Sequence, residues 1–384
     1  MTIRVLHVTT VPMTLRFLRG HAAFMAEHGI ELQFVTSDGP ERLAFAEQEG
    51  VVTHAVEMRR AISPAHDLVA LSRLVGVVRR VAPDIVHSHT PKGGLLGTMA
   101  GRIARVPRRI YHLHGLRYAS EQGWRRRLLM ETERSACAMA TEVISVSHSV
   151  RRSIAADGLC PFDKLRVLAH GSGGVDSGGT FDPARVPADA RAELRAAHGL
   201  SEDDWVVLFV GRLAKDKGIR ELLAAWEIVE RRAPRARLLV VGPVEDVDPE
   251  LLAAARARPQ TITLVGPHRQ VERAYAASDV LVLPTYREGF STVLLEAAAM
   301  RLPRVASAVD GCTDAIDHGR SGLLVPPREA EPLAEALLRY HDHPELAAAH
   351  AEVARRDVVE RFQPVEVLRE LAALYRRDQG LPRK

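Results

Sequence analysis

Two glutamates in the second half of the chain stand where an apolar run gives way to a helical pattern. Glu288 follows the run that ends at Leu283, so its carboxylate could bind sugar hydroxyls. Glu296 lies inside the apolar stretch 293–300, where a lone carboxylate is costly to bury unless it is hydrogen-bonded. A ribose diol offers two donors of the required kind. Between the glutamates, three backbone N–H groups would face a ligand, those of Gly289, Phe290 and Ser291.

A basic loop precedes these glutamates in the segment Gly211-Arg-Leu-Ala-Lys-Asp-Lys-Gly218. A helix is expected to begin near Ile219, and a helix N-terminus carries about half a positive charge together with free N–H groups. Arg212 and Lys217 add two full charges at the same edge. Together these groups suit a diphosphate, and the alternative interpretation is a solvated basic turn.

Histidines recur at the ends of two predicted strands in the first half of the chain. His112 and His114 share one face because side chains alternate along a strand, and Gly115 permits close approach of a ligand. His87 and His89 form a second pair of this kind. The four could be packing or surface residues, or could hold zinc, but carboxylate or cysteine ligands at a suitable spacing are missing. We therefore predict no metal site.

These residues need a scaffold that aligns the ends of several strands. Short Val/Ile/Leu-rich runs alternate with helical patterns, which is typical of parallel strands covered on both faces. The expected strands cover residues 3–9, 31–37, 51–58, 84–89, 109–114, 142–147, 205–210, 237–241, 262–265, 280–284 and 304–308. The expected helices cover residues 15–28, 68–81, 94–106, 124–140, 219–232, 249–257, 271–277, 292–300 and most of 329–377. The pattern predicts a doubly wound α/β fold, which binds ligands beyond the carboxyl ends of its strands.

A Gly/Ser-rich segment at 171–179 interrupts this alternation and coincides with a change in charge. The first 170 residues hold 23 Lys and Arg against 15 Asp and Glu, whereas the remainder holds 29 against 33. We therefore expect two Rossmann-like domains, at residues 1–172 and 173–363, followed by a C-terminal helix within 364–384.

The motif Glu288-Gly-Phe-Ser-x-x-x-Leu-Glu296, preceded by Gly211-Arg212-x-x-x-x-Lys217-Gly218, resembles the retaining glycosyltransferases of family 4, which have the GT-B fold. The resemblance covers most of the chain. It implies that the two domains face a central cleft, with the acceptor on the first domain and the nucleotide sugar on the second. It also implies that the C-terminal helix crosses back onto the first domain.

The same resemblance assigns roles to individual residues. The match to Glu296 binds the nucleotide ribose, and the match to Glu288 contacts the donor sugar. The matches to Arg212 and Lys217 hold the diphosphate. His114 matches the active-site histidine, which contacts the transferred sugar or positions the acceptor. Our predicted catalytic residues are His114, Glu288, Arg212 and Lys217.

Two segments bear on the diphosphate and on metal binding. The loop Thr9–Gly20 lacks the glycine pair that many family members carry there, and Arg16 could compensate for the lost diphosphate contact. Asp246-Val-Asp248 matches a metal-binding Asp-x-Asp pattern, but we interpret it as a loop that enters a helix, with Asp248 near the cap. The resemblance implies no metal or other cofactor, because GT-B enzymes generally need none for the leaving group.

The segments Phe17-Leu-Arg-Gly20 and His89-Thr-Pro-Lys92-Gly-Gly-Leu-Leu-Gly97 are similar to a subset of the family that acts in bacterial surface-polysaccharide assembly. This similarity implies transfer of a hexose or N-acetylhexosamine, from a UDP-linked donor, to a polyprenyl-diphosphate-linked sugar, with Lys92 on the acceptor side.

Other functions remain as alternatives to this one. The acceptor could be a small metabolite such as an aminocyclitol, or the protein could be a GT-B-fold nucleotide-sugar epimerase. A non-catalytic sugar-nucleotide sensor is disfavoured by the intact residues at the strand ends. A nicotinamide dehydrogenase is disfavoured because the first strand is not followed by Gly-x-Gly-x-x-Gly.

Composition limits where the protein acts. The 384 residues are 46% hydrophobic and 26% charged, as in ordinary globular proteins, with no apolar run of the length that a spanning helix needs. The N-terminus does not read as a signal peptide, and the scattered cysteines fit a reducing cytoplasm. These cysteines are Cys137, Cys160 and Cys312.

Arginines gather in the basic first half, within residues 102–127. An anionic bilayer attracts such segments by about 1 kcal/mol per basic residue near its surface. We expect the contact to involve Arg125, Arg126 and Arg127 beside Trp124, and the alternative is a solvated surface. Nucleic acid is not expected as a partner, because stacking aromatic residues do not interleave with the arginines.

Overall fold

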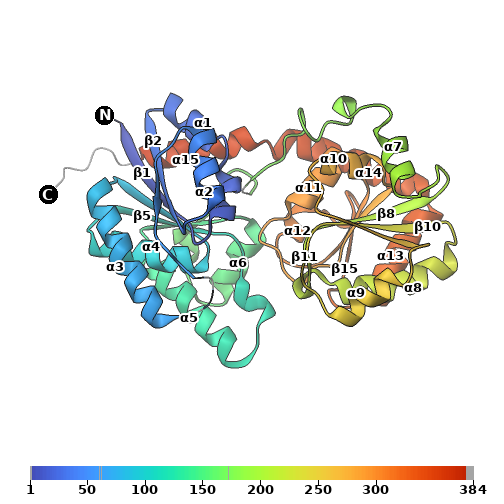
Figure 1. Cartoon of the computed structure of the whole chain (residues 1–384), viewed down its shortest axis with the longest axis horizontal. Helices are drawn as coiled ribbons and strands as arrows, with labels where there is room; N and C mark the ends of the chain where they lie inside the picture. Colours follow the sequence, from blue (N-terminus) through green and yellow to red (C-terminus); the bar gives the residue numbers. More distant parts are fainter. Residues whose placement is uncertain (1, 60, 62, 172, 378–384) are drawn as a thin grey trace. The chain divides into compact units, whose positions relative to one another are not determined.

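The computed structural model describes residues 2–59, 61, 63–171 and 173–377. The chain divides into two compact units (Figure 1). The first contains residues 1–173 and 365–384, and the second contains residues 174–364. These bounds differ by one residue from the division expected at 172/173 and 363/364. Residue 172 and the end of the expected C-terminal helix, 378–384, lie outside the described residues.

The described part of the first unit holds one parallel sheet of seven strands in the order β3-β2-β1-β4-β5-β6-β7. Chain order reverses between β1 and β4, as in a doubly wound fold. The strands are β1 (Ile3–Val8), β2 (Ile30–Thr36), β3 (Thr53–Ala55), β4 (Ile85–His89), β5 (Arg108–Leu113), β6 (Glu142–Ser145) and β7 (Leu165–Arg166).

Helices cover both faces of this sheet (Figure 1). One face carries α3 (Pro64–Val81), α4 (Pro91–Ile103) and α5 (Gly123–Met139). The other carries α1 (His21–Glu27), α2 (Pro40–Glu49) and α15 (Pro364–Arg376). The helix α6 (His148–Ala156) follows β6. The remaining short helices are the 3-10 turns η1 (Pro12–Leu18), η2 (Arg117–Ser120) and η3 (Phe162–Lys164).

The C-terminal helix α15 belongs to the core of the first unit. Its residues Val367, Leu371 and Tyr375 are buried in one cluster with Val5 and Phe34 of the sheet. The Arg108 guanidinium at the start of β5 donates hydrogen bonds to two of the last carbonyls of α15, those of Leu374 and Tyr375, and to the Arg377 carbonyl just after the helix. Apolar burial and these capping bonds hold the helix on the first unit.

The described part of the second unit holds a parallel sheet of six strands in the order β12-β10-β8-β13-β14-β15. The strands are β8 (Trp205–Val210), β10 (Ala236–Val241), β12 (Ile262–Gly266), β13 (Val280–Leu283), β14 (Arg304–Ser307) and β15 (Leu323–Val325). A separate pair joins β9 (Leu213–Ala214) to β11 (Val244–Asp246). Together the two doubly wound units confirm the predicted α/β architecture.

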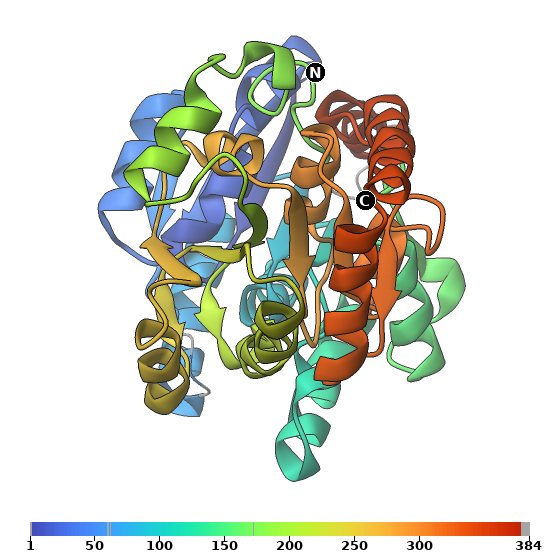
Figure 2. The same ribbon diagram turned by 90° about the vertical axis from the view of Figure 1, so that its right-hand side faces the viewer.

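Helices again lie on both faces of the second sheet. Figure 2 shows α8 (Ile219–Arg232) and α13 (Ala330–Asp342) side by side over one face, with α9 (Pro249–Arg256) near them. The other face carries α10 (Val271–Ala276), α11 (Thr292–Ala299) and α14 (Pro344–Arg361). The short elements η4 (Pro183–Arg185), α7 (Ala190–Ala197), η5 (Lys215–Lys217) and α12 (Cys312–Ala315) complete the unit.

Some expected elements were wrong in extent or missing. The stretch 15–28 is not one helix, because Gly20 adopts φ +74° and separates η1 from α1. The elements α2, α6, α7, β7 and β15 were not predicted. Most of them are short, and α6 was missed although Ser147 accepts a hydrogen bond from Val150 N–H as a helix cap. Among the described residues, none of the helices combines the length and the apolar character needed to cross a bilayer.

Candidate functional site

The predicted donor residues of the second unit follow two neighbouring strands. β8 and β13 pair with each other in the sheet, β8 continues to β10 on its other side, and β13 continues to β14. The loops that leave these two strands therefore lie at the topological switch point, where doubly wound sheets bind ligands. The loop after β8 carries Arg212 and Lys217, and the loop after β13 carries Glu288.

The two loops are fastened to each other. Gly218 adopts φ +68°, and a Cβ atom built on it would lie only 1.9 Å from the carbonyl oxygen of Pro284. The carbonyl of Asp216 accepts hydrogen bonds from the Tyr286 N–H (2.9 Å) and from the Thr285 hydroxyl (3.1 Å). The Asp216 carboxylate pairs with Arg287 at 2.8 Å. These contacts fix the position of Lys217 at the end of β13.

Lys217 and Glu288 form an ion pair at this junction. The Lys217 Nζ lies 2.5 Å from the Glu288 Oε1, and both side chains are about 15% exposed, at 16% and 14%. The sequence singled out both residues, but nothing in it predicted that they pair across 71 positions. The ammonium therefore stands beside a carboxylate at a switch point, where either partner could turn to a ligand.

Arg212 lies at the same edge and is more open. Its side chain is 43% exposed, and its guanidinium pairs with Glu245 at 2.7 Å and approaches Asp216 at 3.9 Å. The carboxylates hold the guanidinium without burying it. Arg212 thus remains able to contact an anion at the switch point.

Glu296 is held by a tyrosine that the sequence analysis missed. Its Oε2 accepts a hydrogen bond from the Tyr275 hydroxyl at 2.7 Å, and Tyr275 is fully buried in α10. Burial raises the pKa of the Glu296 carboxyl above its usual value, and the Tyr275 hydrogen bond opposes this rise in pKa. One carboxylate oxygen of Glu296 therefore already accepts a hydrogen bond within the protein, and the second oxygen is available to accept one from a ribose.

The start of α11 supplies free backbone donors. Its first turn is entered through Ser291, which is 3% exposed, and the Leu295 N–H is the donor to the Ser291 carbonyl. The N–H groups that precede Leu295 in the helix have no partner in the helical pattern. The loop before them is tightly packed, since a Cβ on Gly311 would lie 2.6 Å from the Gly289 carbonyl oxygen. The Phe290 ring packs against the Phe362 ring at a tilt, with centroids 5.6 Å apart, so its side chain has a packing role.

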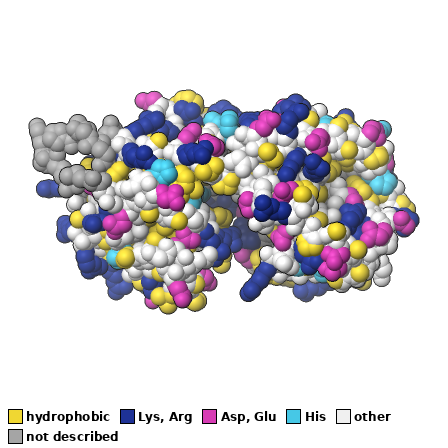
Figure 3. Space-filling view, turned by 90° about the horizontal axis from the view of Figure 1, so that it is seen from above, with side chains coloured by type: hydrophobic (Ala, Val, Ile, Leu, Met, Phe, Trp, Pro, Cys, Tyr) yellow, Lys and Arg dark blue, Asp and Glu magenta, His cyan; other side chains and the backbone are white. Residues whose placement is uncertain are grey.

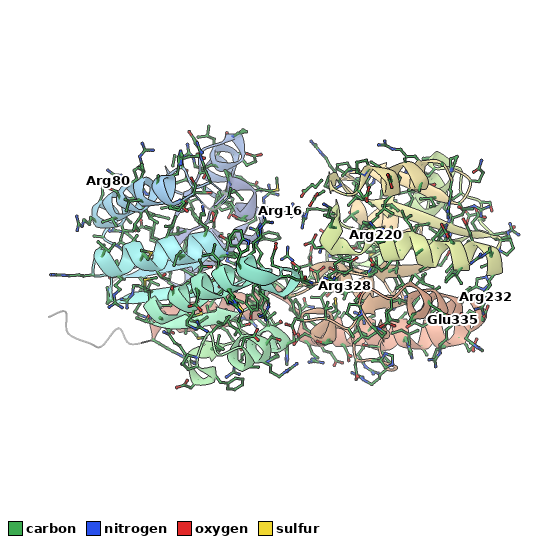
Figure 4. The ribbon with its side chains drawn as sticks, turned by 90° about the horizontal axis from the view of Figure 1, so that it is seen from below. Arg16, Arg80, Arg220, Arg232, Arg328 and Glu335 are labelled. Atoms are coloured by element: carbon green, nitrogen blue, oxygen red, sulfur yellow. The ribbon has the colours of Figure 1, made fainter. Side chains whose placement is uncertain are left out.

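Two further arginines lie at this end of the second unit. Figure 4 shows Arg220 and Arg328 at the end of the unit opposite the Arg232–Glu335 pair. Arg220 occupies the first turn of α8 and is 65% exposed, and the Arg328 guanidinium lies 4.5 Å from the centre of the Tyr286 ring. Neither arginine was predicted from the sequence as a candidate anion contact. The sequence marks them only as basic residues that follow a strand.

The Asp246-Val-Asp248 segment enters a helix cap, as interpreted, but Asp246 ends strand β11 and does not lie in a loop. Asp248 accepts a hydrogen bond from the Glu250 N–H at 3.1 Å and caps α9. Asp246 lies 3.6 Å from Lys215. The two carboxylates are thus occupied by a cap and an ion pair.

In the first unit, histidines from three adjacent strands meet at the carboxyl end of the sheet. His7 pairs in register with His87, and His89 pairs in register with His112. We call the set His7, His87, His89, His112 and His114 the histidine layer. His7 was not singled out from the sequence, because it stands alone in its strand.

A chain of hydrogen bonds runs through this layer. His114 Nε2 lies 2.9 Å from His89 Nδ1, and His89 Nε2 lies 2.9 Å from His7 Nδ1. His7 Nε2 lies 3.3 Å from the Tyr375 hydroxyl, which lies 2.5 Å from His87 Nδ1. His114 is solvent-exposed at one end of the chain, whereas the other four histidines are buried. Burial lowers the pKa of His7 to about 3, so its ring is neutral at pH 7.

Other predicted residues of the first unit have separate environments. Lys92 is 14% exposed, and its Nζ is held 2.7 Å from Asp67, so its charge is already paired. Arg16 lies on η1 with its guanidinium 4.8 Å from the centre of the Phe17 ring (Figure 4). It is exposed and able to meet an anion.

Only some arginines of the predicted cluster at 102–127 are exposed on the surface. Arg108 binds Glu142 and the end of α15, and Arg109 binds the carbonyls of Val106 and Met139, so these two arginines have structural roles. The exposed members near the start of α5 are Arg125 and Arg127, beside Trp124, which is 68% exposed. Arg126 is half-buried, over Tyr118 and 4.0 Å from Asp157. On the face drawn in Figure 3, basic and acidic side chains are intermingled on both units.

The two halves of the chain each match a glycosyltransferase family. Residues 15–171 match the family described as glycosyl transferase 4-like domain, and residues 204–343 match the glycosyl transferases group 1. Both matches fall within the compact units that the structure shows.

Similar proteins include a capsular polysaccharide biosynthesis glycosyltransferase, CapM, of Staphylococcus aureus, which is 29% identical over 97% of this chain and 96% of its own. A UDP-Gal:alpha-D-GlcNAc-diphosphoundecaprenol alpha-1,3-galactosyltransferase of Escherichia coli is 27% identical over 82% of this chain and 81% of its own. An alpha-D-kanosaminyltransferase of Streptomyces kanamyceticus is 29% identical over 78% of each chain.

Among solved structures, Anabaena Alr3699/HepE in complex with UDP is similar in fold, with a TM-score of 0.79 and 19% identity over 97% of this chain and 99% of that one. WaaG, a glycosyltransferase involved in lipopolysaccharide biosynthesis, gives a TM-score of 0.73 and 18% identity over 98% of this chain and 100% of that one. These likenesses support the two-unit fold.

Proposed function

Because this chain belongs to the family 4 glycosyltransferases of the GT-B fold, we propose that it transfers a hexose or N-acetylhexosamine from a UDP-linked sugar to an acceptor hydroxyl with retention of configuration. The observation that carries the proposal is the Lys217–Glu288 pair at the switch point of the second unit. In this pair, an ammonium that could bind a diphosphate is in direct contact with a carboxylate that could bind sugar hydroxyls.

The pair explains how the leaving group is stabilised. A bound diphosphate carries more negative charge than one carboxylate, so Lys217 turns to the phosphate and Glu288 is freed to accept hydrogen bonds from the donor sugar. Arg212 and the free N–H groups of α11 add to the positive potential. Charge on the diphosphate grows as the glycosidic bond stretches, so these groups bind the transition state more strongly than the ground state.

The nucleotide end of the donor is recognised by Glu296. Its Oε2 is fixed by Tyr275, so the carboxylate presents the remaining oxygen to the ribose hydroxyls. The UDP and UDP-glucose complexes of the Anabaena structure support uridine diphosphate as the first nucleotide to test. No metal ion is needed in this account, because side chains and backbone dipoles supply the positive charge.

A lipid-linked sugar is the proposed acceptor. The Escherichia coli relative is named for an undecaprenyl-diphosphate-linked acceptor, and the Staphylococcus relative for capsular polysaccharide. The exposed Trp124, Arg125 and Arg127 would hold the protein on an anionic membrane, on the cytoplasmic side where nucleotide sugars are made available. His114 is exposed and would contact the transferred sugar or the acceptor.

A second candidate acceptor is a small metabolite such as an aminocyclitol. The experiment presents the protein with UDP-glucose, UDP-galactose and UDP-N-acetylglucosamine, each with a short-chain polyprenyl-diphosphate sugar or with an aminocyclitol. Proton NMR of the product reports the anomeric configuration. Transfer to the polyprenyl acceptor with an α-linkage from an α-linked donor supports the proposal. Donor consumed without any acceptor would instead indicate an epimerase.

A further inference from the structure

The histidine layer of the first unit has more ring nitrogens than its hydrogen bonds use. His112 is 7% exposed, and neither its Nδ1 nor its Nε2 has a hydrogen-bond partner within the part of the chain that the structure describes. A buried polar atom without a partner is destabilising, and such atoms in a folded protein usually have a function or an unobserved ligand. The two ring nitrogens of His112 are therefore candidates for binding a ligand.

His112 does not stand alone. One ring nitrogen from each of His89, His112 and His114 lies within 4.8 Å of the other two. The His112 and His114 rings are stacked with centroids 4.5 Å apart, and the His89 ring lies 5.2 Å from that of His114. The three come from the ends of β4 and β5, which are hydrogen-bonded to each other, so the sheet fixes their spacing.

We propose that His89, His112 and His114 form a binding site for a divalent transition-metal ion of the zinc class. Imidazole is a preferred ligand of zinc, copper, nickel and iron. Three histidines with an open fourth position make a common arrangement for zinc. His114 is exposed, so the fourth position faces solvent, where a water molecule completes the coordination.

An ion requires its ligand nitrogens to move, and the stacked His112 and His114 rings must tilt so that their nitrogens converge on it. His89 Nδ1 and His114 Nε2 share a hydrogen bond of 2.9 Å. A tetrahedral zinc ion with bonds of about 2.0–2.1 Å holds its ligand atoms roughly 3.3–3.4 Å apart. The two nitrogens would part by about 0.4 Å, which the exposed His114 side chain can supply by rotation. The ion replaces the shared hydrogen and gives His112 the partner that it lacks.

The hydrogen bonds behind the site can all be donated in the direction that metal binding at His89 Nδ1 requires. A metal on His89 Nδ1 requires the hydrogen of that ring on Nε2, which then donates to His7 Nδ1. His7 donates in turn from Nε2 to the Tyr375 hydroxyl, and Tyr375 donates to His87 Nδ1. Each donor in this order meets an acceptor. Outer partners of this kind orient metal-binding histidines.

A second group of three, His7, His87 and His89, also has ring nitrogens within 4.8 Å of one another. All three side chains are at most 3% exposed, so an ion would have no solvent-facing position there. The outer group is therefore the one that we assign. The proposed ion is not part of the transfer reaction, and it would compete with substrate for His114.

The test uses the full chain without a histidine tag, freed of metal by chelation. Zn²⁺ binding is measured by calorimetry, and Co²⁺ binding by visible absorption, which reports the ligand geometry. One ion per chain is expected. His114→Gln, at an exposed position, should weaken binding by at least the about 10–100-fold that loss of an outer partner costs. His66→Gln, at another exposed histidine of the first unit, is the control and should bind as the wild type does.

A second variant distinguishes loss of metal binding from loss of folding. His112→Phe keeps a stacked ring but removes both unpartnered nitrogens, so it should lose the ion and also raise the melting temperature of the metal-free protein. Wild-type protein that binds no ion, or binding that survives both His114→Gln and His112→Phe, would overturn the proposal. The latter result would place the ion in the inner group or on the surface.

Discussion

Lys217 Nζ lies 2.5 Å from Glu288 Oε1, although the two residues are 71 positions apart in the chain. The contact exists because the loop after β8 is bound to the loop after β13 through Asp216 and Gly218. A cation and a carboxylate are thereby kept together at the switch point of the second unit. The proposed function depends on this pair opening when a diphosphate binds.

Replacement of Lys217 by alanine should lower kcat strongly. Loss of one preorganised charge-stabilising donor costs about 10²–10³ in turnover, or about 2.7–4 kcal/mol. The matched control is Lys215→Ala, two residues away, whose side chain is 72% exposed and is paired with Asp246. Steady-state kinetics with a saturating donor compares the two variants. Equal rates in both would remove Lys217 from the leaving-group role.

Arg212→Ala should also reduce kcat, for the same electrostatic reason. Arg235→Ala is its control, since Arg235 makes a similar exposed pair with Asp203 but lies before β10, at the other end of the sheet. Both variants should melt near the wild-type temperature, because exposed ion pairs contribute little stability. An Arg212 variant with full turnover would contradict the assignment.

Gly218→Ala should both destabilise the second unit and damage activity. The positive φ alone costs a side chain about 1–2 kcal/mol, and the added Cβ would also collide with Pro284. Gly199→Ala separates these effects, because Gly199 has φ +67° with no atom within 4 Å of its Cβ position. Chemical denaturation should show the larger loss for Gly218→Ala. If the two variants lose the same stability and both keep full activity, the loop contact has no role in the site.

Tyr275→Phe should change the pH dependence of UDP binding. The Tyr275 hydrogen bond opposes the rise in the Glu296 pKa, so its removal raises that pKa further. Only the ionised carboxylate accepts hydrogen bonds from both ribose hydroxyls, so affinity falls as pH drops through the pKa. The fall should begin at a higher pH in the variant than in the wild type. Calorimetric titrations at a series of pH values below neutral measure it in both proteins.

Glu296→Gln provides the reference for that experiment. A neutral amide does not titrate, so UDP binding should be weaker than in the wild type at neutral pH and should lose the dependence on this group. An unchanged affinity in Glu296→Gln would place the ribose elsewhere.

A separate buried acid controls stability in the first unit. Glu133 is 2% exposed, it accepts a hydrogen bond from Tyr111 at 2.6 Å, and burial raises its pKa to about 7. The unfolded chain has the lower, ordinary pKa near 4.5. The folded state therefore binds this proton more tightly, and stability falls as pH rises from about 4.5 to 7. Above that range the loss approaches about 3 kcal/mol.

Glu133→Gln should remove this dependence and be more stable than the wild type at pH 8. The exposed neighbour Glu131, paired with Arg134, supplies the control Glu131→Gln, which should keep the wild-type profile. Urea denaturation at pH 5 and pH 8 gives the comparison. A Glu133→Gln profile parallel to that of the wild type would show that Glu133 ionises freely in the folded protein.

The sequence predicted the alternation of strands and helices and most residues at the switch point, because buried parallel strands and glycine turns leave local signals. It could not predict the pairing of Lys217 with Glu288 or of Tyr275 with Glu296, since both depend on long-range register. His7 was missed for the same reason, because a single histidine in an apolar strand has no local partner. The basic segment 102–127 also contains Arg108 and Arg109, whose structural roles could not be predicted because the count of arginines says nothing of the carbonyls that they bind.

The most direct measurement is a crystal structure of the protein with UDP. We expect the diphosphate against Lys217 and Arg212 at the start of α11, Glu288 released from Lys217, and the ribose on the free oxygen of Glu296. A nucleotide found away from these residues, with the Lys217–Glu288 pair intact, would contradict this expectation.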